Sequence, residues 1–304
     1  MARVVFLGTP EAAIPTLESL AEHHDIALVV TQPDRPRGRS RTPMPPPVKE
    51  HAASLGLEVA QPGSRVELEE AIGEHGPFDV GVVVAYGRLL PPQVLDAPEH
   101  GLLNVHFSLL PRWRGAAPVA RSLIAGDPMT GVTIMKLDEG LDTGPIVTAQ
   151  AIDIPENVNT GELTAILADM GAQLLVATLP AYLSGDLEPV GQSDDGATYA
   201  DKIEAGDRSI DPGDDPAAVV AQVRGLAPSP GATLEIDGEP HKILDARSSH
   251  EPVPPGTWAK REGRPIVGLA NGSIELITLQ PPGKTPQHGV DWANGRQRDG
   301  GRVS

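Results

Sequence analysis

The chain contains no cysteine. Disulfide bonds, thiol nucleophiles, iron–sulfur clusters and cysteine-bound zinc are therefore excluded. The nine histidines include no pair with the spacing of metal ligands. We expect no metal site.

Long apolar runs are also missing. Residues 82–86 form one of the longest, far short of the ~20 residues that cross a bilayer. Only four or five apolar residues precede Gly8, whereas the apolar core of a signal peptide has ~7–15. The 304 residues have an ordinary composition, with 39% hydrophobic and 21% charged residues. We expect a cytoplasmic globular protein with two domains, without a membrane or an obligate protein partner.

Several enzyme signatures are absent. Gly8 is not part of a G-x-G-x-x-G dinucleotide motif, and the chain has no G-x-x-x-x-G-K-[ST] phosphate loop. H-E-x-x-H and G-x-S-x-G do not occur, so neither a zinc protease nor an α/β-hydrolase is indicated.

Basic residues are in the minority. The 24 Lys and Arg face 41 Asp and Glu, a net charge of −17, which argues against a nucleic-acid partner. The distribution weakens this argument, because residues 209–304 hold 10 basic against 12 acidic residues. Two basic clusters also occur: Arg35, Arg37, Arg39 and Arg41, and then Arg112, Arg114 and Arg121. A local patch can act on phosphates despite an acidic total, since exposed charges beyond ~8–10 Å are largely screened.

Short apolar runs alternate with helix-like segments through the first 180 residues. Strands are expected at 3–8, 26–31, 57–60, 79–85 and 102–107, and helices at 10–22 (capped by Thr9), 47–55, 66–74 and 116–125. This alternation predicts parallel pairing in a doubly wound α/β sheet, whose ligands bind at the carboxyl ends of strands. Apolar segments at 132–137 and 145–154 and a long helix at 160–183 follow.

The composition changes at residues 194–216, which are rich in Asp, Gly and Ser and typical of a linker. A short helix is expected next, with Asp215 as its cap and Pro216 at its first position. Beyond it the apolar period becomes two, and Asp237-Gly238 and Asn271-Gly272 predict hairpin turns. These features predict a small β-barrel, and the polar last twenty residues are expected to fray.

Asn104 and His106 share one face of an expected strand. They suggest a site, although a satisfied core histidine beside an amide explains them equally well. Asp142 lies between Gly140 and Gly144. Such an aspartate is either a carboxylate that contacts a ligand or a residue that only forms a turn. Together, amide, imidazole and carboxylate can polarise an acyl oxygen and accept a proton from an attacking amine.

The segment Asn104-Val-His106-Phe-Ser108-Leu-Leu-Pro111, followed by Gly115, resembles the N-x-H-x-S-L-L-P-x-x-x-G signature of folate-dependent formyltransferases. Asp142 stands 36 residues after His106, the spacing of that family. Further segments resemble the family members that act on methionyl-tRNA: 6–10, 31–36, 82–87, 115–118, 131–135, 140–144, 199–202 and 279–284. The resemblance covers nearly the whole chain and is loosest over 211–264.

This resemblance implies a Rossmann-like catalytic domain at 1–190, a linker at 191–208 and an OB-like tRNA-binding barrel at 209–304. The formyl group of 10-formyltetrahydrofolate would move, without a metal, to the α-amine of methionyl initiator tRNA. Asn104 and His106 would bind the formyl oxygen. Asp142 would keep His106 protonated and oriented, and would relay the proton of the amine.

The resemblance also implies two binding regions. The folate site is expected at Ser108, Leu109, Leu110, Pro111, Tyr86, Gly87, Arg88, Leu89 and Leu90. Arg35, Arg37, Arg39 and Arg41 would lie against the acceptor stem of the tRNA, with Arg39 nearest the first base pair. From the residues alone, a solvated Pro- and Gly-rich loop is nearly as good an interpretation of this arginine cluster.

Three other functions stay open. A formyltransferase of the purine pathway is disfavoured, because it is expected to end near residue 200. A formyltransferase acting on an amino-sugar nucleotide would share the catalytic core and the folate donor, but is not expected to carry the 279–284 segment. A non-catalytic folate- or RNA-binding protein of the same fold is disfavoured, because all three catalytic positions are filled.

Overall fold

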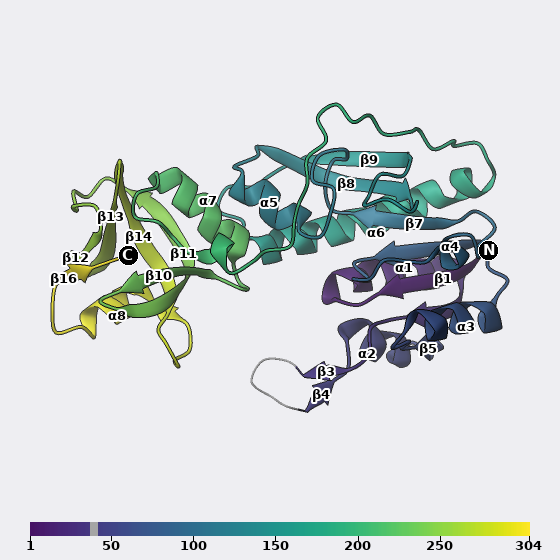
Figure 1. The fold of residues 1–304 in the computed structure, drawn as a ribbon, viewed down its shortest axis with the longest axis horizontal. Helices are drawn as coiled ribbons and strands as arrows, with labels where there is room; N and C mark the ends of the chain where they lie inside the picture. Colours follow the sequence, from purple (N-terminus) through teal and green to yellow (C-terminus); the bar gives the residue numbers. More distant parts are fainter. Residues whose placement is uncertain (37–41) are drawn as a thin grey trace. The chain divides into compact units, whose positions relative to one another are not determined.

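The computed structural model describes residues 1–36 and 42–304, and the chain forms two compact units (Figure 1). The first unit comprises Met1–Ala116, Thr130–Ile152 and Thr164–Ala200, and the second comprises Ala117–Met129, Asp153–Leu163 and Asp201–Ser304. Each unit is built on its own sheet. The domain limits expected from the sequence stay a prediction.

Seven strands form the sheet of the first unit in the order β5-β2-β1-β6-β7-β8-β9. Their bounds are Arg3–Gly8 (β1), Asp25–Val30 (β2), Val59–Ala60 (β5), Val80–Val84 (β6), Leu102–His106 (β7), Met129–Lys136 (β8) and Ile146–Asp153 (β9). The strands from β5 to β7 pair in parallel, whereas β7 and β8 are antiparallel. The predicted Rossmann-like, mainly parallel sheet is confirmed.

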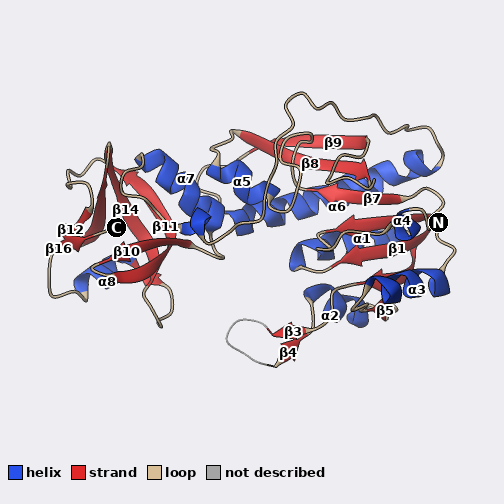
Figure 2. Cartoon of the chain, in the orientation of Figure 1, coloured by secondary structure: helices blue, strands red, loops and turns tan. Residues whose placement is uncertain are grey.

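Helices lie between these strands in the chain and after β9 (Figure 2). They are η1 (Glu11–Ala13), α1 (Ile14–His23), α2 (Pro47–Ser54), α3 (Arg65–His75), α4 (Pro92–Leu95), α5 (Pro118–Ile124) and α6 (Thr160–Leu183), and a small hairpin pairs β3 (Arg35–Pro36) with β4 (Pro43–Met44). Thr9 does not cap the first helix as predicted. Its hydroxyl donates instead to the Tyr86 carbonyl, 3.1 Å away, and so joins the loops after β1 and β6. The strand order reverses direction between these two strands, where sheets of this kind bind ligands.

The 24-residue helix α6 packs on the sheet of the first unit. A Cβ at its Gly171 would collide with the Val105 side chain of β7 and would press on Val132 of β8, 3.3 Å away. Leu167 and Leu175 are fully buried. By length and composition α6 could also cross a membrane, but core helices of soluble proteins pass the same test.

The sheet of the second unit is antiparallel, in the order β10-β11-β14-β13-β12-β16. Its strands are Ala232–Ile236 (β10), Glu239–Ser249 (β11), Thr257–Arg261 (β12), Arg264–Leu269 (β13), Gly272–Gln280 (β14), Gln287–His288 (β15, paired with β14) and Gly300–Arg302 (β16). The helical segments are η2 (Gly206–Arg208), α7 (Pro216–Leu226) and α8 (Gly289–Asn294). Glu235 and Ser304 exchange two backbone hydrogen bonds of 3.0 Å, so the curled sheet closes on itself.

This sheet confirms the small barrel predicted from the turns and the OB-like form that the family resemblance implied. Asp237 and Gly238 have φ of 53° and 83° between the paired Ile236 and Glu239, as a tight hairpin turn requires. Asp215 caps α7 by accepting a hydrogen bond from the Ala217 N–H. The prediction that the last twenty residues fray is wrong, because they contain α8 and β16.

A histidine is buried in this barrel. His241 is fully buried, and its Nδ1 lies 2.8 Å from the Glu239 carbonyl. Its Nε2 faces the Trp292 indole N–H at 3.3 Å and Arg296 at 3.1 Å. The neutral ring donates once and accepts at the other nitrogen, so it satisfies all these partners. Burial lowers the pKa of His241.

We expect this lowered pKa to make the second unit sensitive to acid. Just below pH 6.5 the unfolded chain binds more protons at His241 than the folded protein does, so stability falls as the pH drops toward the folded pKa. The check is urea unfolding at pH 7.5 and 5.5 in a Trp113→Phe background, followed by the fluorescence of Trp258 and Trp292. The loss should be smaller in His241→Gln. Equal losses with and without His241 would contradict this expectation.

Candidate active site

The candidate site lies in the first unit, on the interior strand β7, between β6 and β8. Asn104 is paired with Val83 of β6 on one side and with Met135 of β8 on the other. Val105 faces α6, so Asn104 and His106 project from the opposite face of the sheet. The loop between β8 and β9 carries Asp142.

The Asp142 carboxylate brings the three predicted catalytic residues together. Its Oδ1 accepts a long hydrogen bond of 3.4 Å from the Asn104 amide, and its Oδ2 lies 3.7 Å from His106 Nδ1. The same Oδ2 accepts a 2.8 Å hydrogen bond from the Gly115 N–H. The side chains of His106 and Asp142 are only 5% and 13% exposed, so little water screens their interaction.

The imidazole of His106 has an acceptor at each ring nitrogen. Nε2 lies 2.9 Å from the Trp113 carbonyl, while Nδ1 faces the Asp142 carboxylate. A neutral imidazole carries one N–H, and only the imidazolium can donate in both directions. The Trp113 carbonyl thus holds the ring at Nε2, while Nδ1 lies beside the Asp142 carboxylate.

The loop that carries Asp142 is braced from within. Asp142 has a φ of 53°, in the left-handed region that few non-glycine residues adopt. The Asp138 carboxylate accepts hydrogen bonds from the Gly140 N–H at 3.0 Å and the Thr143 hydroxyl at 2.9 Å. At Gly144 a Cβ would overlap the Lys136 carbonyl, so this position requires glycine.

The predicted folate residues lie in two loops next to these strands. Ser108 is fully buried, and its hydroxyl donates to the Arg112 carbonyl at 2.7 Å. Thr133 donates to the Ser108 carbonyl at 2.7 Å and accepts from the Leu110 N–H at 3.1 Å, which fixes the turn. Leu109 is half-buried, and Pro111 follows Leu110 at the end of the segment.

The second loop follows β6. Tyr86 is 2% exposed and packs in the core, and burial raises the pKa of its phenol. Gly87 is exposed, the Arg88 guanidinium donates to the Pro62 carbonyl at 3.0 Å, and Leu90 packs against the core. Leu89 is 83% exposed, an unusual position for a leucine. The folate assignment of these residues stays a prediction.

The structure tests the two basic clusters to different extents. Arg35 is exposed on β3, whereas Arg37, Arg39 and Arg41 lie outside the described residues. The expectation of a second phosphate-facing patch is wrong for two of its members. Arg114 is 3% exposed and pairs with Asp194 at 3.2 Å, and Arg121 pairs with Asp207 at 2.9 Å. Arg112 lies over the Trp113 ring, 4.3 Å from its centroid.

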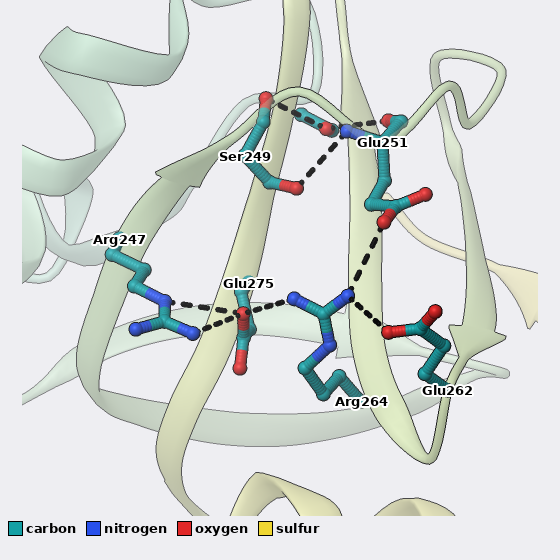
Figure 3. A network of polar contacts seen from close by, with 7 residues as sticks. Arg247, Ser249, Glu251, Glu262, Arg264 and Glu275 are labelled. Carbon is teal, nitrogen blue, oxygen red and sulfur yellow. Dashed lines mark hydrogen bonds and ion pairs between the residues drawn. The ribbon is translucent and has the colours of Figure 1, made fainter.

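Carboxylates also neutralise part of the basic surface of the barrel. Arg264 pairs with Glu251, Glu262 and Glu275, and Arg247 pairs with Glu275 at 2.8 Å (Figure 3). In the part of the barrel that the structure describes, five exposed basic side chains make no ion pair: Lys242, Arg261, Lys284, Arg298 and Arg302. Over residues 1–36 and 42–304, no group of three or more His, Asp and Glu side chains is arranged to hold a metal ion.

Sequence reasoning missed part of the site's support. Residues 192–200, which it assigned to a linker, run along the loop that follows β7. Thr198 accepts hydrogen bonds from Trp113 N–H and Arg114 N–H at 2.9 Å each, and the Ala200 N–H donates to the Arg114 carbonyl at 2.7 Å. Only the resemblance of 199–202 to a known family hinted at this role.

Comparison with known families decides the affiliation. The family model described as “Formyl transferase” matches residues 2–179, and that described as “Formyl transferase, C-terminal domain” matches residues 202–297. The chain belongs to the formyl transferase family. Among relatives in the family, the methionyl-tRNA formyltransferase of Halorhodospira halophila is 46% identical over 302 residues, 97% of each chain. That of Roseobacter denitrificans is 43% identical and aligns over 99% of this chain and 98% of its own.

Solved structures share the fold of this formyl transferase family member. The N-formyltransferase from Helicobacter canadensis, in complex with folinic acid and dTDP-3-aminofucose, has a TM-score of 0.71 at 18% identity, covering 92% of this chain and 100% of its own. HypX from Aquifex aeolicus, in complex with tetrahydrofolic acid, has a TM-score of 0.69 at 16% identity, covering 96% of this chain. The present chain spans about half the length of HypX, 47%. At these identities the likeness concerns the fold alone.

Proposed function

We propose that this protein transfers the formyl group of 10-formyltetrahydrofolate to the α-amine of methionyl initiator tRNA, as a cytoplasmic enzyme of translation initiation. The observation that carries the proposal is the end-to-end similarity, at 40–46% identity, to proteins named methionyl-tRNA formyltransferase. The similarity includes the C-terminal domain, and the site of the first unit holds the amide, imidazole and carboxylate that acyl transfer to an amine needs.

Asn104 and His106 act on the oxygen of the formyl group. Their side chains project from one face of β7 beside the same carboxylate. The Nε2 of His106 is engaged by the Trp113 carbonyl at 2.9 Å, whereas its Nδ1 lies 3.7 Å from Asp142, too far for a hydrogen bond. Nδ1 can therefore donate toward an oxygen placed beside it. The long 3.4 Å bond of Asn104 to Asp142 is readily exchanged for one to the substrate. Both donors stabilise the negative charge that gathers on this oxygen as the amine attacks.

Asp142 accepts the proton that the attacking amine must lose. As the amine nitrogen bonds to the formyl carbon, the bond from that carbon to N10 of the folate breaks, and N10 takes up a proton so that tetrahydrofolate leaves neutral at this nitrogen. Its Oδ2 is engaged by the Gly115 N–H at 2.8 Å and faces His106. Within the described part of the chain, Oδ1 accepts only the long hydrogen bond from Asn104. Oδ1 is therefore the oxygen available to the amine, directly or through one water.

The residues near the site suit a folate donor, which supplies the activated formyl group. Leu89 is 83% exposed and Leu141, next to Asp142, is 49% exposed. Exposed leucines beside a polar site provide apolar surface for flat aromatic rings. We assign the loops at 86–90 and 108–111, together with Leu141, to holding the folate.

The alternative acceptor is an amino-sugar nucleotide. Its support is the fold likeness to the Helicobacter canadensis N-formyltransferase, at 18% identity. The proteins named methionyl-tRNA formyltransferase are far more similar to this chain, at 46% and 43% identity. We therefore favour the aminoacyl-tRNA.

An acceptor comparison tests the proposal. The full chain is incubated with 10-formyltetrahydrofolate and either methionyl initiator tRNA or dTDP-3-aminofucose, and formylated products are measured by mass spectrometry. N-acetylmethionyl-tRNA, which lacks a free α-amine, is the matched control. We expect formylmethionine from the first acceptor only. Formylation of the sugar nucleotide alone would favour the alternative.

Binding of the tRNA is expected to weaken strongly with salt despite the net charge of −17. Each neutralised phosphate contributes about −0.7 to −0.9 to the slope of log affinity against log salt, so several contacts give a slope of −2 or steeper, by this rough rule. We propose that these contacts come from Arg35, Arg37, Arg39 and Arg41 and from the exposed basic side chains of the barrel.

Arg39→Ala should reduce formylation of charged tRNA strongly while folate binding stays near normal. Arg65→Ala is the control, because Arg65 is an exposed arginine on α3 that pairs with Glu69 at 2.7 Å. Filter binding between 50 and 200 mM salt and single-turnover formylation provide the measurements. A flat salt response, or equal effects of the two substitutions, would contradict this assignment.

A further inference from the structure

Gln192 contacts the backbone of the loop that carries Asp142. Its side-chain Nε2 donates to the Asp142 carbonyl at 2.9 Å and to the Gly144 carbonyl at 2.7 Å. Its Oε1 accepts from Arg114 Nε at 3.0 Å. Two carbonyl acceptors on one side and a guanidinium donor on the other allow only one orientation of the amide.

Arg114 holds Gln192 from the other side. This arginine is 3% exposed, and its remaining nitrogens donate to Asp194 at 3.2 Å and to the Ser193 carbonyl at 3.4 Å. Arg114 directly precedes Gly115, whose N–H donates to the Asp142 carboxylate. The hydrogen bond between Gln192 and Arg114 thus links two segments that fix Asp142. Gln192 holds the backbone of Asp142, and the segment of Arg114 and Gly115 holds its carboxylate.

The turn at Asp142 needs such a link. With a φ of 53°, Asp142 occupies a region that persists in non-glycine residues only when the surroundings hold it. Gln192 binds the carbonyls on both sides of Thr143, so it prevents the turn from relaxing. If the turn relaxed, the carboxylate would leave its place beside His106 and the Gly115 N–H.

We propose that Gln192 is a positioning residue for the reaction, acting through Asp142 and itself held by Arg114. The proposal rests on the function proposed above for Asp142. A productive carboxylate must lie within a fraction of an ångström of its place, and a displacement of about 1 Å can cost a hundredfold in rate. Loss of Gln192 should therefore affect the chemical step rather than binding.

The chain offers a matched control in the second unit. Gln222 also donates from Nε2 to two backbone carbonyls, those of Asp207 and Ser209, at 3.0 Å each. Gln192→Glu and Gln222→Glu thus remove the same kind of hydrogen-bond pair and add the same charge. Gln192→Glu keeps an acceptor for Arg114 but turns a carboxylate toward two carbonyl oxygens.

The experiment is single-turnover formylation of methionyl initiator tRNA at saturating folate and tRNA. Gln192→Glu should lower the rate about ten- to a hundredfold. The dissociation constants for the tRNA and for 10-formyltetrahydrofolate should each stay within about threefold of wild type. Gln222→Glu should leave the rate unchanged. Gln192→Met, which keeps the size and adds no charge, should lose rate similarly and covers the case in which Gln192→Glu fails to fold.

The Asp142→Asn background separates positioning from a general structural role. If Gln192 acts through Asp142, adding Gln192→Glu to Asp142→Asn should cost almost nothing further. Three results would each overturn the proposal. The first is a wild-type formylation rate in both Gln192→Glu and Gln192→Met, and the second is an equal loss of rate in Gln222→Glu. The third is a loss of rate from Gln192→Glu that is as large in the Asp142→Asn background as in the wild type. A wild-type protein that does not formylate methionyl-tRNA would instead refute the proposed function.

Discussion

His106→Ala and Asn104→Ala are each expected to lower the rate of formyl transfer about a hundred- to a thousandfold, with little change in tRNA affinity. Each substitution removes one donor to the oxygen that gains charge in the transition state, an interaction that the bound ground state lacks. Single-turnover formylation and equilibrium tRNA binding, measured on the same preparations, check the expectation.

His100→Ala is a suitable control for this experiment. The His100 side chain lies beside Tyr182, with ring centroids 6.2 Å apart, and has no place in the proposed mechanism. It should retain the wild-type rate. If either site variant kept more than about a third of the wild-type rate, its catalytic assignment would be wrong, because loss of such a donor costs far more.

Asp142→Asn is expected to fold normally and to lose about two to four decades in rate, the range for loss of a general base. The substitution is nearly isosteric. It removes the charge that faces His106 at 3.7 Å and the oxygen that accepts the amine proton. Single-turnover formylation gives the rate, and urea unfolding verifies the fold.

Asp169→Asn provides the matched control, since Asp169 is exposed on α6 in the same unit. It removes the same charge from the protein without touching the site. Comparable rates for the two variants would remove Asp142 from the role of proton acceptor, whatever the effect on stability.

The fold was largely predictable because its elements have strong local patterns. β1 and α6 begin and end where the apolar periodicity placed them, and Asp215 caps α7 as its sequence position indicated. The C-terminal residues were not predictable in this way. Gly300 and Gly301 carry no side-chain pattern, and they join the barrel through backbone hydrogen bonds that almost any sequence can make.

The candidate site was predictable where side chains alternate along one strand. Asn104 and His106 share a face because β7 is extended, and the Asp142 carboxylate lies beside both. Gln192 could not be found this way, because it acts on backbone carbonyls 48 and 50 residues away. Every residue has a backbone carbonyl, so the sequence does not indicate which carbonyls a side chain will bind.

The second basic cluster shows the opposite error, since here the sequence suggested a feature that the structure lacks at Arg114 and Arg121. Arg114 and Arg121 stand close together in the sequence and suggested an exposed patch. Their carboxylate partners, Asp194 and Asp207, lie 80 and 86 residues further along the chain, and only the tertiary structure reveals them. A cluster of like charge therefore predicts a binding surface only when no distant partner neutralises it.

The central claim is that Asn104, His106 and Asp142 act as one unit in transferring a formyl group to methionyl-tRNA. Its most direct test is the single-turnover formylation rate of His106→Ala, Asp142→Asn and the double variant. Residues that act as a unit are non-additive, so the double variant should lose about as much rate as the worse single variant. Losses that multiply in the double variant would mean that the two side chains act independently, and would contradict the account.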